Sequence, residues 1–227
     1  MSDIDAHYTA FHQKRLGVHC YPSEFLVRTL LGQYPALKLA HRYENAHMLD
    51  WGCGDGRNLL LLHNLKARVF GMEVTQSLCD DVTRRMAGMA VSADIRVGRN
   101  SRTPFDDHFF DYVIASNSLY YVDAEEHFSM TLRELNRVIR KGGYLIATFP
   151  HPNTFILAGA KEREDSHFEI TNDLHGLRNG SLFKVFKTKE QLIQEFSPDF
   201  TDIAIGETHD NYYGYQVSCW LFVGKKR

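Results

Sequence analysis

The sequence predicts an α/β fold, in which a mostly parallel sheet is covered by helices on both faces. Short apolar runs alternate with helical stretches from residue 47 onward, which is the pattern of such a sheet. A turn with three glycines joins the first apolar run to the next helical stretch. The second apolar run ends in an acid, Glu73, about 20 residues beyond this turn. At 227 residues with 44% hydrophobic content, the chain can bury one substantial core, which favours a single domain.

The alternation assigns each stretch of the central region to an element. We expect strands at 47–51, 68–74, 94–98, 109–116 and 143–149, and helices at 56–65, 76–88 and 123–139. The last of these helices has Asp123 as its expected N-cap and Glu126 as the partner in a capping box. Gly142 and Gly143 are expected to end it.

The two ends of the chain carry further elements. Residues 3–14 and 22–31 show helical spacing of apolar side chains, and Pro22 suits a first helical turn. Near the C-terminus, Thr188 is the expected cap of a helix that reaches Phe196. Two strands follow at 200–206 and 213–223, with 207–211 as the hairpin connection. We divide the single domain into an N-terminal helical cap (1–45), a cofactor-binding core (46–150), a substrate-side insertion (151–187) and a C-terminal helix and strand pair (188–227).

The glycine turn consists of Gly52, Gly54 and Gly56, with Asp50 two residues ahead of the first glycine. Glycine tolerates backbone angles that other residues avoid, and a ligand can lie against its main chain beside the unpaired amides of a helix N-terminus. A nucleotide-like ligand suits such a turn. A dinucleotide fold, however, has the spacing G-x-G-x-x-G, and here the third glycine position holds Arg57.

Glu73 is the expected ribose ligand, because an acid at this distance from the turn can accept hydrogen bonds from both ribose hydroxyls. With this residue, the chain resembles the class I S-adenosylmethionine-dependent methyltransferases. The resemblance rests on 49–56, on Glu73, and on the stretches 104–114 and 135–145. It implies a Rossmann-like, doubly wound, seven-stranded sheet with an antiparallel C-terminal strand, and S-adenosylmethionine as the cofactor. It also implies an N-terminal helical lid, in which we place Tyr8, Phe11 and Tyr21; the alternative is that these residues only cap the sheet edge.

Ligands of open parallel sheets lie at the carboxyl ends of the strands, and this places the remaining candidates. Asp50 either braces the glycine turn or reaches the amino acid part of the cofactor through water. The cofactor-binding residues implied by the resemblance are Asp50, Gly52, Cys53, Gly54, Gly56, Asn58, Glu73, Val74, Asn100, Ser101, Ser116 and Asn117.

The adenine contact departs from the family pattern. The family often has an acid after the position of Gly98, and this chain has Arg99. Ser101 or the backbone of Asn100 are the expected replacements, and Arg99 is expected to be a solvated loop residue.

Two residues are the catalytic candidates. His151 follows the fifth strand between two prolines, and its pKa range suits a general base. Tyr121 follows the fourth strand and is expected near the reactive methyl group. The alternatives are that His151 is a loop histidine without a role and that Tyr120 and Tyr121 only pack. If these residues converge with Asn117 and the C-terminal tyrosines, the acceptor pocket has aromatic walls; those tyrosines are Tyr212, Tyr213 and Tyr215.

Composition excludes several classes of function. A net charge of −2 gives no general attraction to nucleic acid. The four cysteines (Cys20, Cys53, Cys79 and Cys219) show no paired spacing and form no metal-like cluster with the twelve histidines, so we expect reduced thiols and no metal. The polar N-terminus lacks the pattern of a signal peptide, and no apolar stretch is long enough to span a membrane. We therefore expect a cytoplasmic protein; the sequence leaves its oligomeric state open.

Together these observations predict an enzyme that transfers a methyl group from S-adenosylmethionine to a hydroxyl or amine of a small polar metabolite, by in-line displacement. Two alternatives stay open. A non-catalytic nucleotide-binding module would have the same binding residues. A nicotinamide-dependent oxidoreductase would share the turn and Glu73, but Arg57 and the C-terminal strand pair argue against it.

Overall fold

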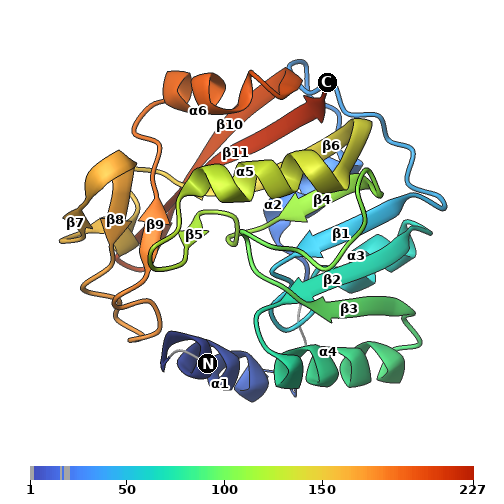
Figure 1. The fold of residues 1–227 in the computed structure, drawn as a ribbon, viewed down its shortest axis with the longest axis horizontal. Helices are drawn as coiled ribbons and strands as arrows, with labels where there is room; N and C mark the ends of the chain where they lie inside the picture. The colour runs from blue at the N-terminus through green and yellow to red at the C-terminus, as the bar shows by residue number, and fades with distance from the viewer. Residues whose placement is uncertain (1–2, 16, 18–20) are drawn as a thin grey trace.

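A computed structural model describes residues 3–15, 17 and 21–227. Its centre is a seven-stranded mixed sheet with the strand order β10-β11-β6-β4-β1-β2-β3 (Figure 1). Five neighbouring strands, from β6 to β3, run parallel, whereas β11 pairs antiparallel with both β6 and β10. The predicted fold class, including the antiparallel C-terminal strands, is confirmed.

The strands of this sheet are β1 (His47–Trp51), β2 (Arg68–Glu73), β3 (Ala93–Val97), β4 (Phe110–Ala115), β6 (Ile139–Pro150), β10 (Phe200–Tyr212) and β11 (Tyr215–Lys226). The helices are α1 (Asp3–Arg15), α2 (Glu24–Leu31), α3 (Leu59–Asn64), α4 (Gln76–Gly88), α5 (Phe128–Val138) and α6 (Lys189–Phe196), with the short 3-10 helices η1 (Phe155–Leu157) and η2 (Glu164–Ser166).

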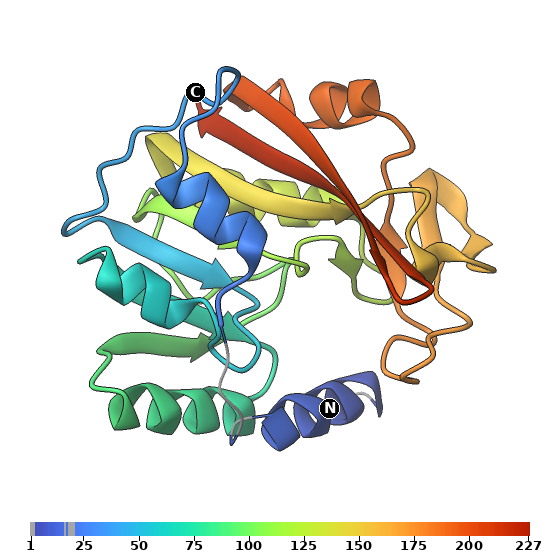
Figure 2. The same ribbon diagram turned by 180° about the vertical axis from the view of Figure 1, so that it is seen from behind.

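The two faces of the sheet bury separate apolar cores. On one face, α5 and α6 contribute Phe128, Leu135 and Phe196 to a core that includes the inward side chains of β4, β6 and β11. On the other face, α2, α3 and α4 pack with residues such as Leu30 and Val82 (Figure 2). A parallel sheet needs both faces covered, which explains why its strands read as continuous apolar runs.

A second, four-stranded antiparallel sheet lies beside the main one, in the order β5-β9-β8-β7. Its strands are β5 (Tyr121–Val122), β7 (Lys161–Glu162), β8 (His167–Glu169) and β9 (Leu182–Lys184). It lies on the side to which β1, β2 and β3 point (Figure 1). The segment expected as a substrate-side insertion, 151–187, therefore supplies three strands of this small sheet and pairs through β9 with β5, which follows β4.

The helix predicted to begin at Asp123 begins five residues later, at Phe128 with His127 as N-cap. The predicted capping box is wrong because both of its acids have other partners. The Asp123 carboxylate accepts hydrogen bonds from the Arg99 guanidinium, 3.1 Å from each oxygen, and the Glu126 carboxylate accepts one from Ser101. These contacts fasten the chain after β4 to the loop after β3.

Gly142 and Gly143 do not end this helix, which stops at Val138, directly before β6. Phe110 pairs with Ile139, and Tyr112 then pairs with Tyr144, so four residues of β6 lie opposite one residue of β4. Gly142 takes a positive φ of 78° in this bulge. A bulge with a left-handed residue favours glycine, so the pair marks an irregular strand.

The C-terminal hairpin is longer than predicted, because its strands continue through the expected connection at 207–211. Tyr212 pairs with Tyr215, and the turn is Tyr213-Gly214, with positive φ at both residues. A two-residue turn of this kind fits the twist of the strands, and glycine accepts it without strain.

Two smaller boundaries also differ. The helix predicted from residue 56 begins at Leu59, and Pro22 lies just before the N-cap Ser23 of α2. Thr188 caps α6 as predicted, by accepting a hydrogen bond from the Gln191 amide. Among the described residues, none of the helices has the length and apolarity needed to cross a bilayer.

Candidate functional site

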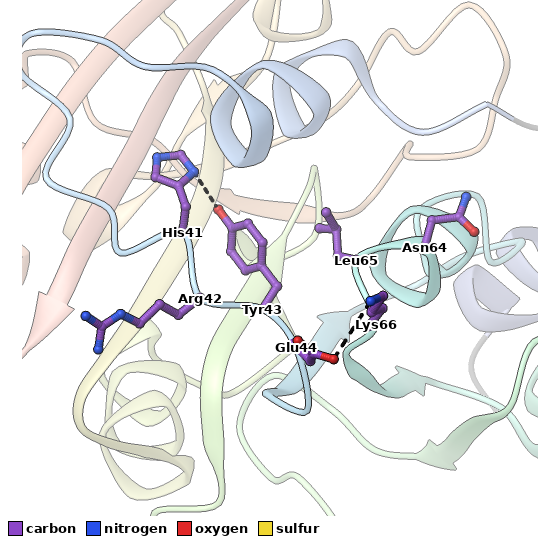
Figure 3. A pocket seen from close by; sticks show the side chains of 7 residues that line it. All are labelled: His41, Arg42, Tyr43, Glu44, Asn64, Leu65 and Lys66. Atoms are coloured by element: carbon purple, nitrogen blue, oxygen red, sulfur yellow. Dashed lines mark hydrogen bonds and ion pairs between the residues drawn. The ribbon is translucent and has the colours of Figure 1, made fainter.

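The candidate site lies where β1, β2 and β4 end, at the point where the strand order reverses. A separate surface hollow of about 480 Å³ lies elsewhere, between the segment before β1 and the end of α3 (Figure 3). His41, Tyr43, Glu44 and Lys66 are among its lining residues. These residues precede β1 and β2, so the hollow is at the amino ends of the strands, away from the candidate site.

The glycine turn has the expected backbone, and two of its amides are hydrogen-bonded to the neighbouring strand. Gly52 and Gly54 take φ of 72° and 59°, and a Cβ on Gly52 would lie 2.6 Å from the Cβ of Ser118. The amides of Gly52 and Cys53 both donate to the Met72 carbonyl. The turn is therefore tied to the end of β2, and these two amides are already used within the fold.

Two predicted cofactor residues point into the core. A Cβ on Gly56 would lie 2.8 Å from Val82 on α4, and the thiol of Cys53 packs against Gly71 of β2. Gly56 thus permits close packing of α4, and Cys53 is buried. Their side-chain positions offer nothing to a ligand. Cys53, Cys79 and Cys219 form no disulfide, and Cys20 lies outside the described residues.

Glu73 lies at the end of β2 with a buried carboxylate. Its Oε1 accepts hydrogen bonds from the Gly54 amide at 2.5 Å and from the Tyr8 hydroxyl at 3.2 Å, and its Oε2 accepts one from the Val74 amide at 3.0 Å. Burial raises the pKa of Glu73 to about 7, although these three donors oppose the shift. The carboxylate is therefore fixed in orientation and can change its charge near neutral pH.

Asp50 is the second buried carboxylate of the site. Its Oδ1 accepts a long hydrogen bond, 3.5 Å, from the side-chain amide of Asn58, which also accepts from the Ser23 amide. Among the described residues, nothing hydrogen-bonds to the buried Oδ2. Burial raises the pKa of Asp50 to about 7. An unsatisfied buried oxygen is costly, and at a strand end beside the glycine turn it fits an amino group of a ligand.

Helix α1 lies over this site. The Tyr8 hydroxyl binds Glu73, and the His12 ring occupies the space beside Gly54, 2.8 Å from where a Cβ would be. Thr9 contacts Thr75 at 3.0 Å, and Arg15 pairs with the buried Asp55 at 3.4 Å. Burial lowers the pKa of His12 to about 4. A neutral, largely buried ring therefore covers the glycine turn.

The predicted lid residues do not all contribute to this cover. Phe11 packs edge-on against His12, but Tyr21 is 75% exposed. The Tyr21 carbonyl accepts a hydrogen bond from Arg57. The prediction that Tyr21 belongs to the lid is therefore wrong, because its ring faces solvent.

The loop after β3 links α1 to the segment that follows β4. Arg99 pairs with Asp5 of α1 at 2.6 Å and with Asp123 at 3.1 Å, so it is not a solvated loop residue. The side-chain oxygen of Asn100 accepts from the Trp51 indole at 2.6 Å, and its amide donates to three carbonyls after β4. Only the backbone of Asn100 is left for an adenine contact, and the Ser101 hydroxyl donates to Glu126.

The end of β4 carries Ser116 and Asn117. The Ser116 hydroxyl contacts that of Ser23 at 3.3 Å. Asn117 has a φ of 58°, and both its amide and its side-chain oxygen bind the Thr148 hydroxyl of β6. Asn117 therefore joins the ends of β4 and β6.

Tyr121 begins the small sheet and stacks against Tyr120. Its hydroxyl accepts a hydrogen bond from Arg178 at 3.3 Å. Arg178 is held by the buried Asp173, whose carboxylate also accepts backbone amides of its own loop. This loop approaches α1, since a Cβ on Gly180 would lie 3.9 Å from Ile4. Sequence reasoning missed Arg178 and Asp173, because neither residue stands in a motif.

His151 lies just beyond β6 and faces the C-terminal hairpin. Its Nδ1 accepts a hydrogen bond from the Asn153 amide, so the neutral ring in this geometry carries its proton on Nε2. That atom is 3.8 Å from the Glu207 carboxylate, and the ring packs on Trp220. Burial lowers the pKa of His151. A general base needs a free lone pair, so this tautomer does not favour the role, which stays a prediction.

The expected aromatic pocket around His151 does not form from the predicted residues. Tyr213 is fully exposed at the hairpin turn, and Tyr212 is 53% exposed. Tyr215 packs against Phe155. Within the described residues, no hydrogen bond, ion pair or ring contact joins His151 to Asn117 or Tyr121. The convergence on which the aromatic pocket depends is therefore not met by Tyr212 and Tyr213, which the long hairpin carries outward.

Comparison with known proteins assigns the domain. Residues 49–147 match a methyltransferase domain family. A malonyl-[acyl-carrier protein] O-methyltransferase of Legionella pneumophila is 32% identical over 126 residues, which cover 52% of this chain and 40% of that protein. The chain spans less than half the length of this and other curated relatives that it matches.

Solved structures agree in fold. A SAM-dependent methyltransferase of Methanosarcina mazei has a TM-score of 0.63 at 20% identity, covering 86% of this chain and 99% of that one. The cyclase SpnF has a TM-score of 0.55 at 17% identity, covering 81% of this chain and 75% of that one. The fold is thus also found in a protein named for another reaction.

The sheet with its antiparallel end, the glycine turn and the acid at the end of β2 define an S-adenosylmethionine-binding fold. Residues 49–147 are a methyltransferase domain, and proteins similar to this domain are named as S-adenosylmethionine-dependent methyltransferases, whose methyl donor is S-adenosylmethionine.

Proposed function

We propose that the protein transfers a methyl group from S-adenosylmethionine to a hydroxyl or amine of a small polar molecule. The observation that supports this most is the pair of buried carboxylates, Asp50 and Glu73, on the two strands that flank the glycine turn. The unsatisfied Oδ2 of Asp50 suits the ammonium group of the cofactor, and Glu73 suits its ribose hydroxyls. The residues present therefore fit the cofactor.

When bound, S-adenosylmethionine supplies a methyl group that its sulfonium already activates, so the protein has mainly to align the acceptor and exclude water. Asp50 would hold the ammonium group of the cofactor and Glu73 its ribose hydroxyls. Tyr8 and His12 of α1 cover the glycine turn and keep water out. Tyr121, fixed by Arg178, orients the acceptor. With His151 in its observed hydrogen bonds, catalysis would rest on alignment of a neutral amine or an already ionised hydroxyl, because neither has to lose a proton before it reacts.

The names of two relatives bear on the kind of acceptor. The Legionella pneumophila relative is named as a malonyl-[acyl-carrier protein] O-methyltransferase. A Mycobacterium ulcerans relative, 31% identical over 135 residues, is named as a methyltransferase of phthiotriol dimycocerosates. Neither name refers to nucleic acid, and a net charge of −2 supplies no attraction for it.

Two alternatives remain to be tested. A nicotinamide oxidoreductase is disfavoured because Arg57 occupies the third glycine position and donates to the Tyr21 carbonyl. A protein that uses this fold without methyl transfer has a parallel in the cyclase SpnF.

The test is incubation of the purified protein with methyl-labelled S-adenosylmethionine and a panel of small hydroxyl- and amine-bearing metabolites. We expect label in one acceptor class together with an equal amount of S-adenosylhomocysteine. Cofactor binding without transfer to any acceptor would favour the non-catalytic alternative, and binding of NADH would favour the oxidoreductase.

A further inference from the structure

Three metal-ligating side chains meet on one face of the C-terminal part of the main sheet. They are His151, just beyond β6, and Glu207 and His209 of β10. The Nε2 of His209 is 2.9 Å from the Glu207 Oε2, and the Nε2 of His151 is 3.8 Å from the same oxygen. One ligand atom from each residue lies within 4.8 Å of the others.

The strand pairing explains why these residues meet. His209 pairs with Ser218 of β11, and the His151 amide donates to the Ser218 carbonyl, so Ser218 lies between the two histidines in one row of the sheet. Its small, buried side chain leaves room above it, where the imidazole rings approach to 4.7 Å between centroids. Glu207 is two residues before His209 and therefore points to the same face. The positions are fixed by hydrogen-bonded strands.

The spacing suits a small divalent ion. Zinc binds imidazole nitrogen and carboxylate oxygen at about 2.0–2.2 Å, which places tetrahedral ligand atoms about 3.3 Å apart. The distances from the Glu207 carboxylate oxygen to the two imidazole nitrogens, 2.9 and 3.8 Å, lie on either side of this value. Two imidazoles and one carboxylate fill three of the four positions around a tetrahedral ion. Water can take the fourth position, because Glu207 and His209 are half exposed to solvent.

The second nitrogens of both rings are also held. The Nδ1 of His209 is 3.1 Å from the Ser218 hydroxyl, which can accept the ring proton and leave Nε2 free for a metal. His151 requires a change of tautomer, because its Nδ1 accepts the Asn153 amide. Binding at Nε2 moves the ring proton to Nδ1 and releases this amide. Asn153 is exposed, so water can replace the lost hydrogen bond.

We propose that His151, Glu207 and His209 form a binding site for one divalent transition-metal ion of the zinc type. Mixed imidazole and carboxylate ligands select zinc, nickel, cobalt or copper over magnesium and calcium, which prefer oxygen alone. The site is independent of the cofactor-binding residues at the ends of β1 and β2, and it is a site of binding without an assigned step in the reaction. The spacing of 151, 207 and 209 along the chain matches no metal motif, which is why the sequence predicted none.

The test is calorimetric titration of the chelator-treated 227-residue protein with zinc chloride. We expect one zinc ion per chain, with a dissociation constant on the order of micromolar, and at least about a 10-fold loss of affinity in His209→Ala and in Glu207→Gln. Both side chains are exposed to solvent, so we expect the two variants to fold as the wild type does. His175→Ala, a change of an exposed loop histidine, is the matched control and should bind as the wild type does.

Cobalt gives an independent readout of the ligands. Titration with cobalt chloride should produce visible absorption bands of a four- or five-coordinate ion that disappear in His209→Ala, without the thiolate charge-transfer bands that cysteine ligation would cause. Absence of stoichiometric zinc binding to the wild-type protein would overturn the proposal. Binding that is equally strong in both ligand variants, or thiolate bands with cobalt, would overturn it as well.

Discussion

The cofactor side and the acceptor side of this molecule are built in different ways. The glycine turn, Asp50 and Glu73 come from one continuous stretch, 48–74, in which strand, turn and helix follow one another. The proposed acceptor side instead rests on contacts between residues far apart in the chain, namely Tyr121 with Arg178, and His151 with Glu207 and His209 of the hairpin. The first kind of site leaves a local pattern in the sequence, whereas the second depends on pairings that only the folded chain shows.

The largest expected effect is on the cofactor side. Glu73→Ala should weaken binding of S-adenosylhomocysteine by about 1.5–3 kcal/mol, or roughly 10- to 150-fold, since a hydrogen bond to a charged group is lost. Calorimetry measures this directly. Glu44→Ala is the control, because Glu44 is an exposed acid before β1, at the amino ends of the strands and away from the candidate site. Equal affinities in wild type and Glu73→Ala would remove Glu73 from the site.

The buried Asp50 carboxyl should lower the free energy of unfolding at neutral pH. Burial raises its pKa to about 7, whereas an unfolded aspartate has a pKa of about 3.9. The folded protein therefore binds a proton at Asp50 more tightly than the unfolded chain does. Ionisation of this buried carboxyl does not lower the free energy of unfolding below about pH 4. The loss grows as the pH rises and is complete above about pH 7.

Asp50→Asn carries no such charge and keeps an oxygen for Asn58. We expect its free energy of unfolding at pH 8 to exceed that of the wild type by about 1–3 kcal/mol, with a smaller difference at pH 5. Urea unfolding at both values tests this. A variant less stable than the wild type at pH 8 would show that the ionised carboxylate has a stabilising partner.

A smaller effect concerns the cover over the cofactor side. The Tyr8 hydroxyl occupies an acceptor position on the Glu73 Oε1, which the Gly54 amide also uses, so it competes with a ribose hydroxyl. Tyr8→Phe should tighten binding of S-adenosylhomocysteine by about 2- to 10-fold, because the hydroxyl that competes for this carboxylate oxygen is removed. Tyr213→Phe, at the exposed hairpin turn, is the control. Weaker binding in Tyr8→Phe would mean that the hydroxyl contacts the cofactor itself.

The smallest effect is expected on the acceptor side. His151→Ala, assayed with a chelator present, should lower the turnover number less than about 10-fold, because the His151 ring contacts Glu207, His209 and Trp220 and its Nε2 carries a proton in the observed tautomer. A loss of about 10²–10⁴-fold with unchanged cofactor affinity would instead establish His151 as the general base.

Most of the main sheet was predictable because its signals are local. Apolar runs fixed the positions of its strands, and Thr188 marked the start of α6. The start of α5 was missed because Asp123 and Glu126, which fit a capping box, bind Arg99 and Ser101 instead. The small sheet was missed because its strands are two or three residues long, too short for a periodic pattern.

The candidate site divides in the same way. Asp50 and Glu73 were predicted as site residues from their spacing around the glycine turn and from the family resemblance. The pairing of Arg178 with Asp173, and the meeting of His151 with His209, depend on residues that no motif connects. Arg99 could not be placed from sequence, since its partners Asp5 and Asp123 lie in other segments.

The measurement that tests the cofactor site most directly is calorimetric titration of the wild-type protein with S-adenosylhomocysteine and with NADH, at pH 6 and pH 8. Burial raises the pKa of Glu73 to about 7, and the ribose needs the ionised carboxylate, so affinity should rise with pH up to about 7 and level off above it. We predict one molecule of S-adenosylhomocysteine per chain, bound more tightly at pH 8 than at pH 6, with the pH dependence reduced in Glu73→Gln, and no binding of NADH. Saturable binding of NADH, or no binding of S-adenosylhomocysteine at either pH, would contradict the assignment.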